Sequence, residues 1–523
     1  MRDTLRIGID VGGTNTDAVV LDGSTVLGWA KRPTTPDVTS GVAAALAAVL
    51  CETAIEPLRV AAVMVGTTHF TNAVVQRRGL ERTAALRLCL PAGQSLPPFI
   101  DWPDDLCAAI GAEYRLLGGG FEFDGRPIAP LDEAELRAAL DELLAHGVQA
   151  VAISGIFSPV DAAQEERAAE LLRAWAPALN VTLSHEIGRI GLLERENAAL
   201  LNACLAPVAT HVIGQLEATV RAAGLACPLY LSQNDGTLMA AAHAMRYPVL
   251  TFASGPTNSM RGAALLSGVR DGVVIDVGGT SADFGMLSGG FPREAGFEVA
   301  VGGVRTNFRM PDLLSLALGG GSVVADGGRA VGPLSVGYEL AARGCVFGGD
   351  TLTATDIGVA AGLAQIGEPG RVRDLDPAVV RRALALIRER LETALDRMRT
   401  SADPVPVIAV GGGSFLVPAD LAGAARVLRP PHDQVANAVG AALAQVSGEI
   451  DRVFIVDGRA RSDILAEARR EADERAVAAG ADSGTLELVE VDEVPLSYLP
   501  STAVRVRVKV VGELAGQPRE AAL

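Results

Sequence analysis

Two runs of eight residues in this chain follow one pattern: Asp10-Val11-Gly12-Gly13-Thr14-Asn15-Thr16-Asp17 and Asp276-Val277-Gly278-Gly279-Thr280-Ser281-Ala282-Asp283. Each run follows an apolar segment, Leu5–Ile9 or Val273–Ile275, that is typical of a buried strand. The paired glycines let the backbone turn sharply, so that N–H groups and hydroxyls can approach an anion. The aspartate at the strand end can hold a hydrated Mg²⁺ that bridges to phosphate oxygens. One copy could be an ordinary strand and turn, but two equivalent copies indicate two phosphate loops that face one nucleotide.

Length and composition restrict the class of protein. A chain of 523 residues exceeds one core, so two or three domains are expected. Lys and Arg total 45 against 62 Asp and Glu, and the net charge of −17 disfavours nucleic-acid binding. No apolar run approaches the ~18 residues that a membrane span needs, and the first strand follows Met1 closely, so we expect a cytoplasmic protein without a membrane anchor.

Cysteine and histidine spacing predicts no local metal site. The six cysteines form no CxxC pair and stand mostly among apolar neighbours, which favours reduced core residues. The six histidines show neither HExxH nor HxH spacing, so the sequence declares no zinc site built from neighbouring residues.

Polar or glycine-rich loops directly after predicted strands recur in three further segments: Gly66–Asn72, Ser232–Gly236 and Gly411–Ser414. In an open α/β sheet, ligands gather at the carboxyl ends of the strands, so these loops are candidates for a binding site. The triple glycine of the third loop would let a flat ligand such as adenosine lie against the backbone. Two other glycine-rich loops, Leu318–Ser322 and Asp326–Gly328, could equally line a ligand or form plain turns.

Two other regions have their own pattern. A long helix is expected from about Gly191 through Ala223, and the polar run Glu194-Arg195-Glu196-Asn197 in it is most simply a solvated helix face. After residue 451, one charged helix and several alternating strands predict a small α+β appendage for packing or assembly.

In this order, the elements resemble the nucleotide-binding superfamily of actin, sugar kinases and heat-shock chaperones and, within it, the hydantoinase A/5-oxoprolinase family. The stretches that carry the resemblance are Gly8–Asp17, Gly66–Ala73, Arg77–Gly79, Ser254–Pro256, Asp276–Asp283, Leu318–Ser322, Val331–Ser335, Thr355–Asp356 and Ala409–Ser414. The resemblance implies an α/β fold with two RNase H-like (actin/sugar kinase-like) domains around an ATP cleft. We expect the domains at residues 1–190, with the first phosphate loop, and 191–450, with the second phosphate loop and the adenosine loop. The appendage would occupy residues 451–523.

The chemistry that the resemblance implies is ATP-dependent opening of a cyclic amide, such as a hydantoin or 5-oxoproline, through phosphorylation of its carbonyl oxygen. The implied cofactors are ATP and Mg²⁺. Asp10 and Asp276 would hold Mg²⁺ and act in catalysis together with Thr14 and Thr280. The implied nucleotide-binding residues are Gly12, Gly13, Thr14, Asn15, Gly278, Gly279, Thr280, Ser281, Gly411, Gly412, Gly413 and Ser414. The implied substrate residues are Thr67, Thr68, Asn72, Arg195, Asn234 and Asp235, with Glu196 as a further candidate.

Family members also act with a second large subunit, so a hydantoinase B-like partner and a homo- or hetero-oligomer are expected. Two other functions stay open on the two loops alone. One is a small-molecule kinase, which would release a stable phosphorylated product. The other is a non-catalytic assembly subunit in which ATP closes the cleft to change the affinity for a partner.

Overall fold

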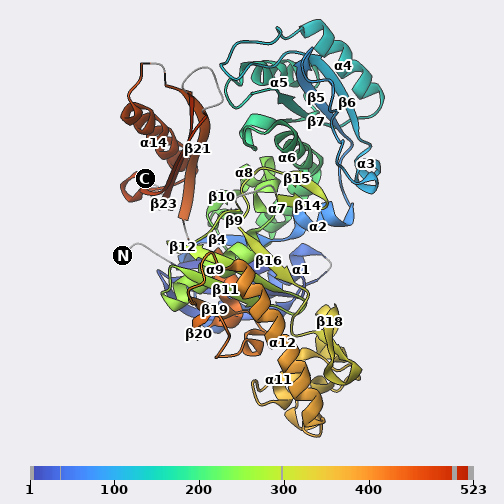
Figure 1. Ribbon diagram of the computed structural model, residues 1–523, viewed down its shortest axis with the longest axis vertical. Helices are drawn as coiled ribbons and strands as arrows, with labels where there is room; N and C mark the ends of the chain where they lie inside the picture. Colours follow the sequence, from blue (N-terminus) through green and yellow to red (C-terminus); the bar gives the residue numbers. More distant parts are fainter. Residues whose placement is uncertain are drawn as a thin grey trace.

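The computed structural model describes residues 5–35, 37–295, 299–443, 445–456, 458–496 and 503–515 (Figure 1). Three sheets carry most of the strands in this part of the chain. The longest has the order β22 (Glu487–Pro495), β23 (Ala503–Glu513), β21 (Gln445–Ile455), β10 (Leu238–Ala240), β9 (Leu229–Ser232), β4 (Val60–Thr67), β1 (Leu5–Val11), β2 (Asn15–Asp22) and β3 (Thr25–Pro33). The expected α/β class is confirmed.

The second sheet repeats the arrangement around β1. Its order is β13 (Phe291–Pro292), β12 (Ala282–Ser288), β11 (Gly272–Val277), β19 (Val405–Val410) and β20 (Ala424–Leu428), with β16 (Leu313–Leu316) also paired to β12. In both sheets a central strand pairs antiparallel with the strand that follows the glycines and parallel with a strand from farther along the chain. Each sheet has its own apolar core, so the sequence repeat corresponds to two structural halves.

A third sheet stands apart from the first two at the upper right of Figure 1. Its parallel strands are ordered β6 (Glu113–Gly118), β5 (Thr83–Leu90), β7 (Ala150–Gly155) and β8 (Asn180–Leu183). Helices α4 (Glu133–Ala145) and α5 (Ala163–Trp175) cover it, and Asp132 caps α4 by accepting hydrogen bonds from the N–H groups of Ala134 and Glu135. Two small ribbons complete the strands of the described residues: β14 (Val299–Val301) with β15 (Val304–Thr306), and β17 (Ser322–Ala325) with β18 (Ala330–Ser335).

Two helices that cross at glycines connect the halves. They are α9 (Ser254–Ser267), which leads into β11, and α13 (Ala436–Ala441), which packs on β1. A Cβ atom at Gly440 would lie 1.8 Å from the carbonyl oxygen of Asn258, and one at Gly262 would lie 1.8 Å from that of Ala436. The helix backbones therefore touch, and no larger residue fits at either position.

The other helices of the described residues have the following bounds: α1 Val38–Thr53, α2 His69–Gln76, α3 Asp104–Ile110, α6 Leu192–Cys204, α7 Ala206–Ala222, α8 Ala241–Arg246, α10 Leu340–Arg343, α11 Ala354–Ala360, α12 Pro377–Met398 and α14 Arg461–Ala478.

The single long helix expected at residues 191–223 is wrong. The chain forms α6 and α7, which meet at Leu205 with a bend of 54°. Pro207 stands in the first turn of α7, where its missing N–H costs no hydrogen bond, but it could not continue α6. In the described part of the chain no single helix is long and apolar enough to cross a membrane, and only the bent pair of α6 and α7 together reaches that composition.

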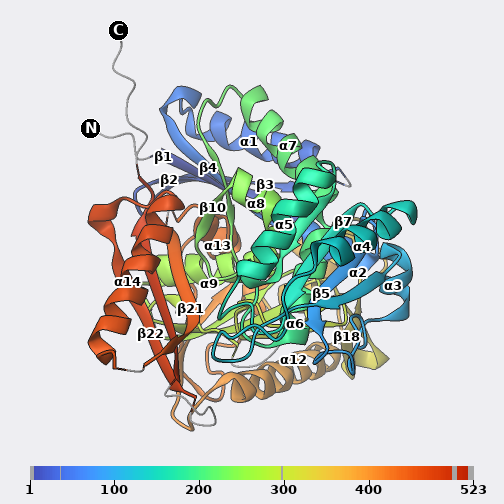
Figure 2. The same ribbon diagram turned by 90° about the horizontal axis from the view of Figure 1, so that it is seen from above.

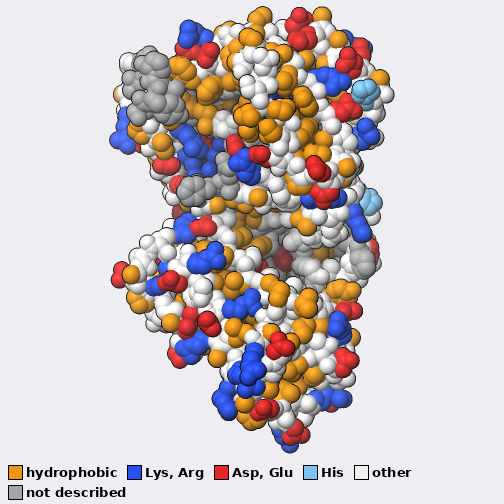
Figure 3. Space-filling view, turned by 45° about the vertical axis from the view of Figure 1, so that its right-hand side comes forward, with side chains coloured by type: hydrophobic (Ala, Val, Ile, Leu, Met, Phe, Trp, Pro, Cys, Tyr) orange, Lys and Arg blue, Asp and Glu red, His pale blue; other side chains and the backbone are white. Residues whose placement is uncertain are grey.

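The C-terminal segment continues the first sheet. Strand β21 begins at Gln445, before residue 451 where the appendage was expected to start, and it pairs with β10 and along its whole length with β23. Helix α14 covers β21 and β23 on one side of the molecule, opposite the third sheet (Figure 2). The domain limits at residues 190 and 450 stay predictions. The face drawn in Figure 3 is hollowed at mid-height.

Candidate active site

The first phosphate loop joins β1 to β2, and the register of three strands sets its charged side chains in a row. Asp10 on β1 lies opposite Asp17 on β2, and Asp17 lies opposite Lys31 on β3. Directly opposed residues of antiparallel strands share one face of the sheet, so the three side chains are neighbours. The Lys31 Nζ lies 2.7 Å from the Asp17 Oδ2, and the Asn437 Nδ2 donates to the Asp10 Oδ2 at 2.9 Å.

The second phosphate loop has a similar row with one difference. Asp276 on β11 lies opposite Asp283 on β12, and Asp283 lies opposite Ser315 on β16. The hydroxyl of Ser315 donates to Asp283 at 2.5 Å, and that of Ser259 donates to the Asp276 Oδ2 at 2.5 Å. A hydroxyl thus occupies the place in the second row that an ammonium occupies in the first.

The two loops face each other across a cleft of about 380 Å³. A Cβ atom at Gly279 of the second loop would lie 3.4 Å from the Thr14 Oγ1 of the first. The residues predicted from the sequence that line the cleft are Asp10, Gly12, Gly13, Thr14, Asn15, Thr68, Asp276, Gly278, Gly279, Thr280, Ser281, Gly411 and Gly412. The loops that are 266 residues apart in the chain therefore form one site.

Only glycine fits at position 411, where the loop of residues 411–414 reaches the cleft. The φ of Gly411 is +88°, and a Cβ atom there would lie 2.2 Å from the Asp276 Oδ1. Gly413 and Ser414, which the sequence also assigns to the nucleotide, lie behind the lining. The Gly413 N–H donates to the Val277 carbonyl, and the buried Ser414 hydroxyl donates to the Asp433 carboxylate at 2.6 Å. Asp433 itself lines the cleft.

The glycine loop at residues 318–322 supports the second phosphate loop. The Gly320 N–H donates to the Gly278 carbonyl at 2.9 Å, and the Gly321 N–H donates to the Gly279 carbonyl at 2.7 Å. A Cβ atom at Gly319 would lie 2.6 Å from the Gly279 carbonyl carbon. Of the two readings that the sequence left open, a turn that holds the phosphate loop in shape is the one that these contacts support.

Asp10 and Asp17 of the first row are buried, and Asp276 and Asp283 of the second row are partly buried. Burial raises the pKa of Asp10 to about 7, with Asp17 as the next cause. Burial raises the pKa of Asp276 to about 6, against the opposing hydrogen bond from Ser259. The Asp10 Oδ1 and the Asp17 Oδ1 are buried without a hydrogen-bond partner. A buried carboxylate oxygen without a hydrogen-bond partner is costly, and a cation bound beside it would offset that cost.

These residues fit Mg²⁺, which prefers one or two carboxylates together with water and substrate phosphates. No group of three or more His, Cys, Asp and Glu side chains among the described residues is arranged to hold a metal ion by itself. An ion held by Asp10 and Asp276 would therefore depend on phosphate oxygens and water for the rest of its coordination.

The residues expected to bind the lactam are not brought together. Thr68 lines the cleft, and the exposed Asn72 donates to its hydroxyl at 3.4 Å. Thr67 is buried, and its Oγ1 lies 2.7 Å from the His69 Nδ1. Asn234 is buried and its side chain holds the backbone of residues 249 and 253. Asp235 forms an ion pair of 2.6 Å with Lys509. Their role in substrate binding stays a prediction.

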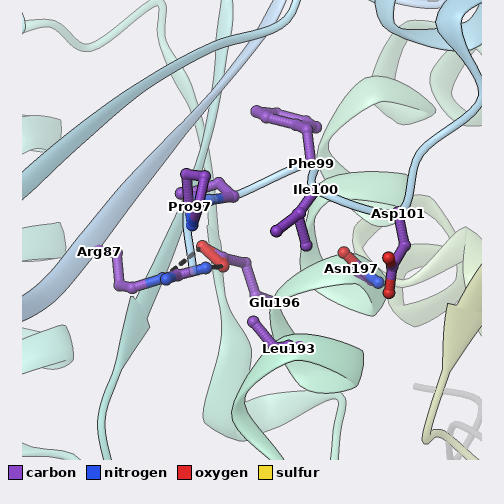
Figure 4. Close-up of a pocket in the computed structure, with 9 residues that line it drawn as sticks. Arg87, Pro97, Phe99, Ile100, Asp101, Leu193, Glu196 and Asn197 are labelled. Atoms are coloured by element: carbon purple, nitrogen blue, oxygen red, sulfur yellow. Dashed lines mark hydrogen bonds and ion pairs between the residues drawn. The ribbon is translucent and has the colours of Figure 1, made fainter. Parts of the chain in front are cut away.

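Three of the four residues of the polar run on α6, Arg195, Glu196 and Asn197, are buried, so the interpretation of the run as a solvated helix face is wrong. Arg195 and Glu196 are 0% and 1% exposed, because α6 packs against β7 and β8 of the third sheet. Figure 4 shows Glu196 paired with the guanidinium of Arg87, next to a very small pocket. The Ser154 hydroxyl also donates to Glu196, and Arg195 donates to the Gly155 carbonyl at 2.5 Å. The period of a helix shows which residues share a face but not what covers that face.

Several residues that line the cleft were not assigned to the site from the sequence: Asp17, Lys31, Gly255, Pro256, Ser259, Asp283, Asp433, Gln434, Ala436 and Asn437. Asp17 and Asp283 could have been found from the sequence, because both copies of the repeat end in an aspartate, seven residues after the first. In a tight hairpin those two positions pair across the strands. Gly255 and Pro256 lie in the stretch Ser254–Pro256, which carries part of the family resemblance, but no local pattern marks the other six residues, which come from distant elements.

The fold and the cleft define an α/β protein with two opposed loops of the kind that binds phosphate. The hydantoinase/oxoprolinase N-terminal region matches residues 6–175, and the hydantoinase/oxoprolinase region matches residues 195–405. The chain therefore belongs to the hydantoinase/oxoprolinase family.

Similar proteins include the caprolactamase subunit alpha of Pseudomonas jessenii, 29% identical over 75% of this chain and 60% of that protein. Another is the acetophenone carboxylase gamma subunit of Aromatoleum aromaticum, 30% identical over 68% of this chain and 53% of that protein. The matches thus span 53 to 60% of the length of these two relatives.

Two solved structures share the fold. The ATP-dependent caprolactamase from Pseudomonas jessenii has a TM-score of 0.77 at 22% identity, over 98% of this chain and 88% of that one. A nucleotide-free acetone carboxylase has a TM-score of 0.68 at 17% identity, with the same coverage.

Proposed function

We propose that this chain is the ATP-binding part of an enzyme that opens a cyclic amide by phosphorylating its carbonyl oxygen. The observation that carries the proposal is the cleft in which two opposed glycine loops each present an aspartate at a strand end, buried at Asp10 and partly buried at Asp276. Family membership supports the reaction class, and the relatives named as a caprolactamase and a carboxylase subunit support ATP-dependent chemistry on a carbonyl group.

In this proposal the loops hold the nucleotide. Backbone N–H groups of both glycine turns and the hydroxyls of Thr14 and Thr280 bind the β- and γ-phosphates. Asp10 and Asp276 hold Mg²⁺, which when bound neutralises charge on the phosphate oxygens. The backbone at residues 411–414 lies beside the adenosine, where the absence of a side chain at Gly411 and Gly412 leaves room for a flat base.

The reaction needs activation because the ring nitrogen donates electrons into the carbonyl group and makes a lactam a poor electrophile. The carbonyl oxygen attacks the γ-phosphorus, and ADP leaves. Water then adds to the activated carbon, the C–N bond breaks with the nitrogen leaving as an amine, and a second water releases phosphate. The protein aligns the γ-phosphate with the carbonyl oxygen, which accounts for much of the rate enhancement in phosphoryl transfer.

The substrate class is a lactam or imide, and Thr68 at the rim of the cleft is the best placed of the predicted substrate residues. A partner subunit is part of the proposal, since the matched relatives are longer and are named as subunits. A cytoplasmic location belongs to the same proposal.

The test is phosphate release by the purified chain, alone and mixed with a candidate partner subunit, against hydantoins, 5-oxoproline and larger lactams. Products are identified by mass spectrometry. Ring-opened product formed together with phosphate supports the proposal, whereas a stable phosphorylated product would make the protein a small-molecule kinase. Asp10→Asn and Asp276→Asn serve as controls, and turnover that survived either change would contradict the Mg²⁺ assignment.

A further inference from the structure

We propose that Lys31 is a catalytic residue that binds the γ-phosphoryl group during its transfer, and that Asp17 positions its ammonium. The inference rests on the proposed function and deepens it by naming the protein cation that acts at the transferred group. Lys31 lies outside the glycine loops, on the strand after the first hairpin.

The two halves of the molecule provide an internal comparison. Both rows contain two aspartates opposite each other, but the third position is Lys31 in the first row and Ser315 in the second. A hydroxyl already satisfies Asp283, so a partner for the second aspartate of a row does not require a cation. Pairing with the second aspartate therefore does not explain why the first row contains an ammonium.

Charge in the cleft points to a reason for the ammonium. Of the described residues that line it, Lys31 alone is cationic, while five are carboxylates: Asp10, Asp17, Asp276, Asp283 and Asp433. A triphosphate adds further negative charge, and a positive group close to the site of transfer offsets the repulsion. Lys31 and both glycine loops line the same cleft.

The Lys31 ammonium has N–H donors that its ion pair does not use. An ammonium carries three N–H groups, and the contact with the Asp17 Oδ2 at 2.7 Å uses one. The side chain remains 31% exposed, whereas Asp17 is 3% exposed, so the carboxylate is the fixed member of the pair. A lysine is a point charge on a flexible stem, and it can follow a phosphoryl group from ADP to the carbonyl oxygen.

The test compares binding of ADP with binding of a non-hydrolysable ATP analogue, both with Mg²⁺, by isothermal titration calorimetry. Lys31→Met should weaken the analogue about 10- to 100-fold and change ADP by less than about threefold, because a charge-assisted hydrogen bond to the γ-phosphate is lost. Lys31→Arg should restore part of the preference for the analogue. Arg32→Met is the matched control, since Arg32 is the exposed next residue of the same strand and its loss changes the net charge equally.

Asp17→Asn should lower the preference for the ATP analogue over ADP several-fold. It should also shift the pH profile of analogue binding, which a purely structural change would not do. Retained ADP binding shows that each variant is folded. Equal losses for ADP and the analogue, or no loss for either, would overturn the role of Lys31 at the γ-phosphate. A wild-type chain that binds neither nucleotide would instead overturn the proposed function.

Discussion

Asp10→Asn should stabilise the protein at pH 8 when no divalent cation is present, although Asp10 is proposed to hold Mg²⁺. Asp10 is 5% exposed, its Oδ1 has no hydrogen-bond partner, and it lies opposite Asp17. The pKa of Asp10 is raised from 3.8 to about 7, mainly by burial. A raised carboxyl pKa means that the folded protein binds the proton more tightly than the unfolded chain does. Ionising Asp10 therefore costs folding free energy.

The sign and the pH window follow from these two pKa values. The cost is nearly absent below pH 4, grows as the pH rises from about 4 to 7, and is complete above pH 7. Its full size is about 4 kcal/mol, since a tenfold change in proton affinity is worth about 1.4 kcal/mol. Roughly 2.5 kcal/mol of this develops between pH 5 and pH 8. Asparagine has a similar shape and no charge, so the variant should not show this loss.

The assay is urea unfolding of the wild type and Asp10→Asn at pH 5 and pH 8, with EDTA and with Mg²⁺. Without cation, the variant should gain about 2 to 3 kcal/mol more over the wild type at pH 8 than at pH 5. Mg²⁺ should stabilise the wild type at pH 8 and the variant much less, because binding to the folded state alone raises stability. Asp141→Asn removes a charge from an exposed helix surface and should show neither effect. The reasoning is refuted if Asp10→Asn is no more stable than the wild type at pH 8, or if its gain is the same at both pH values.

Three further substitutions test the contacts that shape the site and its support. Gly411→Ala should weaken ATP binding at least tenfold and lower the free energy of unfolding by about 1 to 2 kcal/mol, because it adds a side chain at positive φ against the Asp276 carboxylate. Gly412→Ala, with open space around its Cβ position, should leave the melting temperature unchanged. Gly440→Ala should destabilise the protein by about 2 to 3 kcal/mol in urea unfolding, since the helices that join the halves touch there, and an unchanged midpoint would contradict that close contact. Glu196→Gln should lower the free energy of unfolding by about 3 to 5 kcal/mol, because it leaves the buried guanidinium of Arg87 uncompensated. The double variant with Arg87→Met should recover part of this loss.

Much of the fold followed from local patterns. The apolar strands before both glycine pairs depend on residues close together in the chain. The break between α6 and α7 was missed, although Pro207 marks it. The apolar pattern continues through both helices, so it predicted one long helix in spite of the proline.

The candidate site was predictable to a smaller extent. The glycines and aspartates of the loops can be recognised from the sequence, because a sharp turn next to an anion restricts which residues can stand there. Lys31, Ser259 and Asn437 carry no such local mark, since each reaches the cleft through the register or packing of its own element. The burial of Arg195 and Glu196 depended in the same way on a sheet that covers α6 from outside the helix.

The sequence alone was enough to predict an α/β protein with two glycine loops that face one ligand, because the turn, the strand and the carboxylate of each loop lie within eight residues and constrain one another locally. The row of Asp10, Asp17 and Lys31 could be known only from the folded chain. That arrangement depends on which strands pair and in what register, and this is a property of the packed chain. The same packing separated Thr68, which lines the cleft, from Asn234 and Asp235, which lie outside its lining and bond to other parts of the fold.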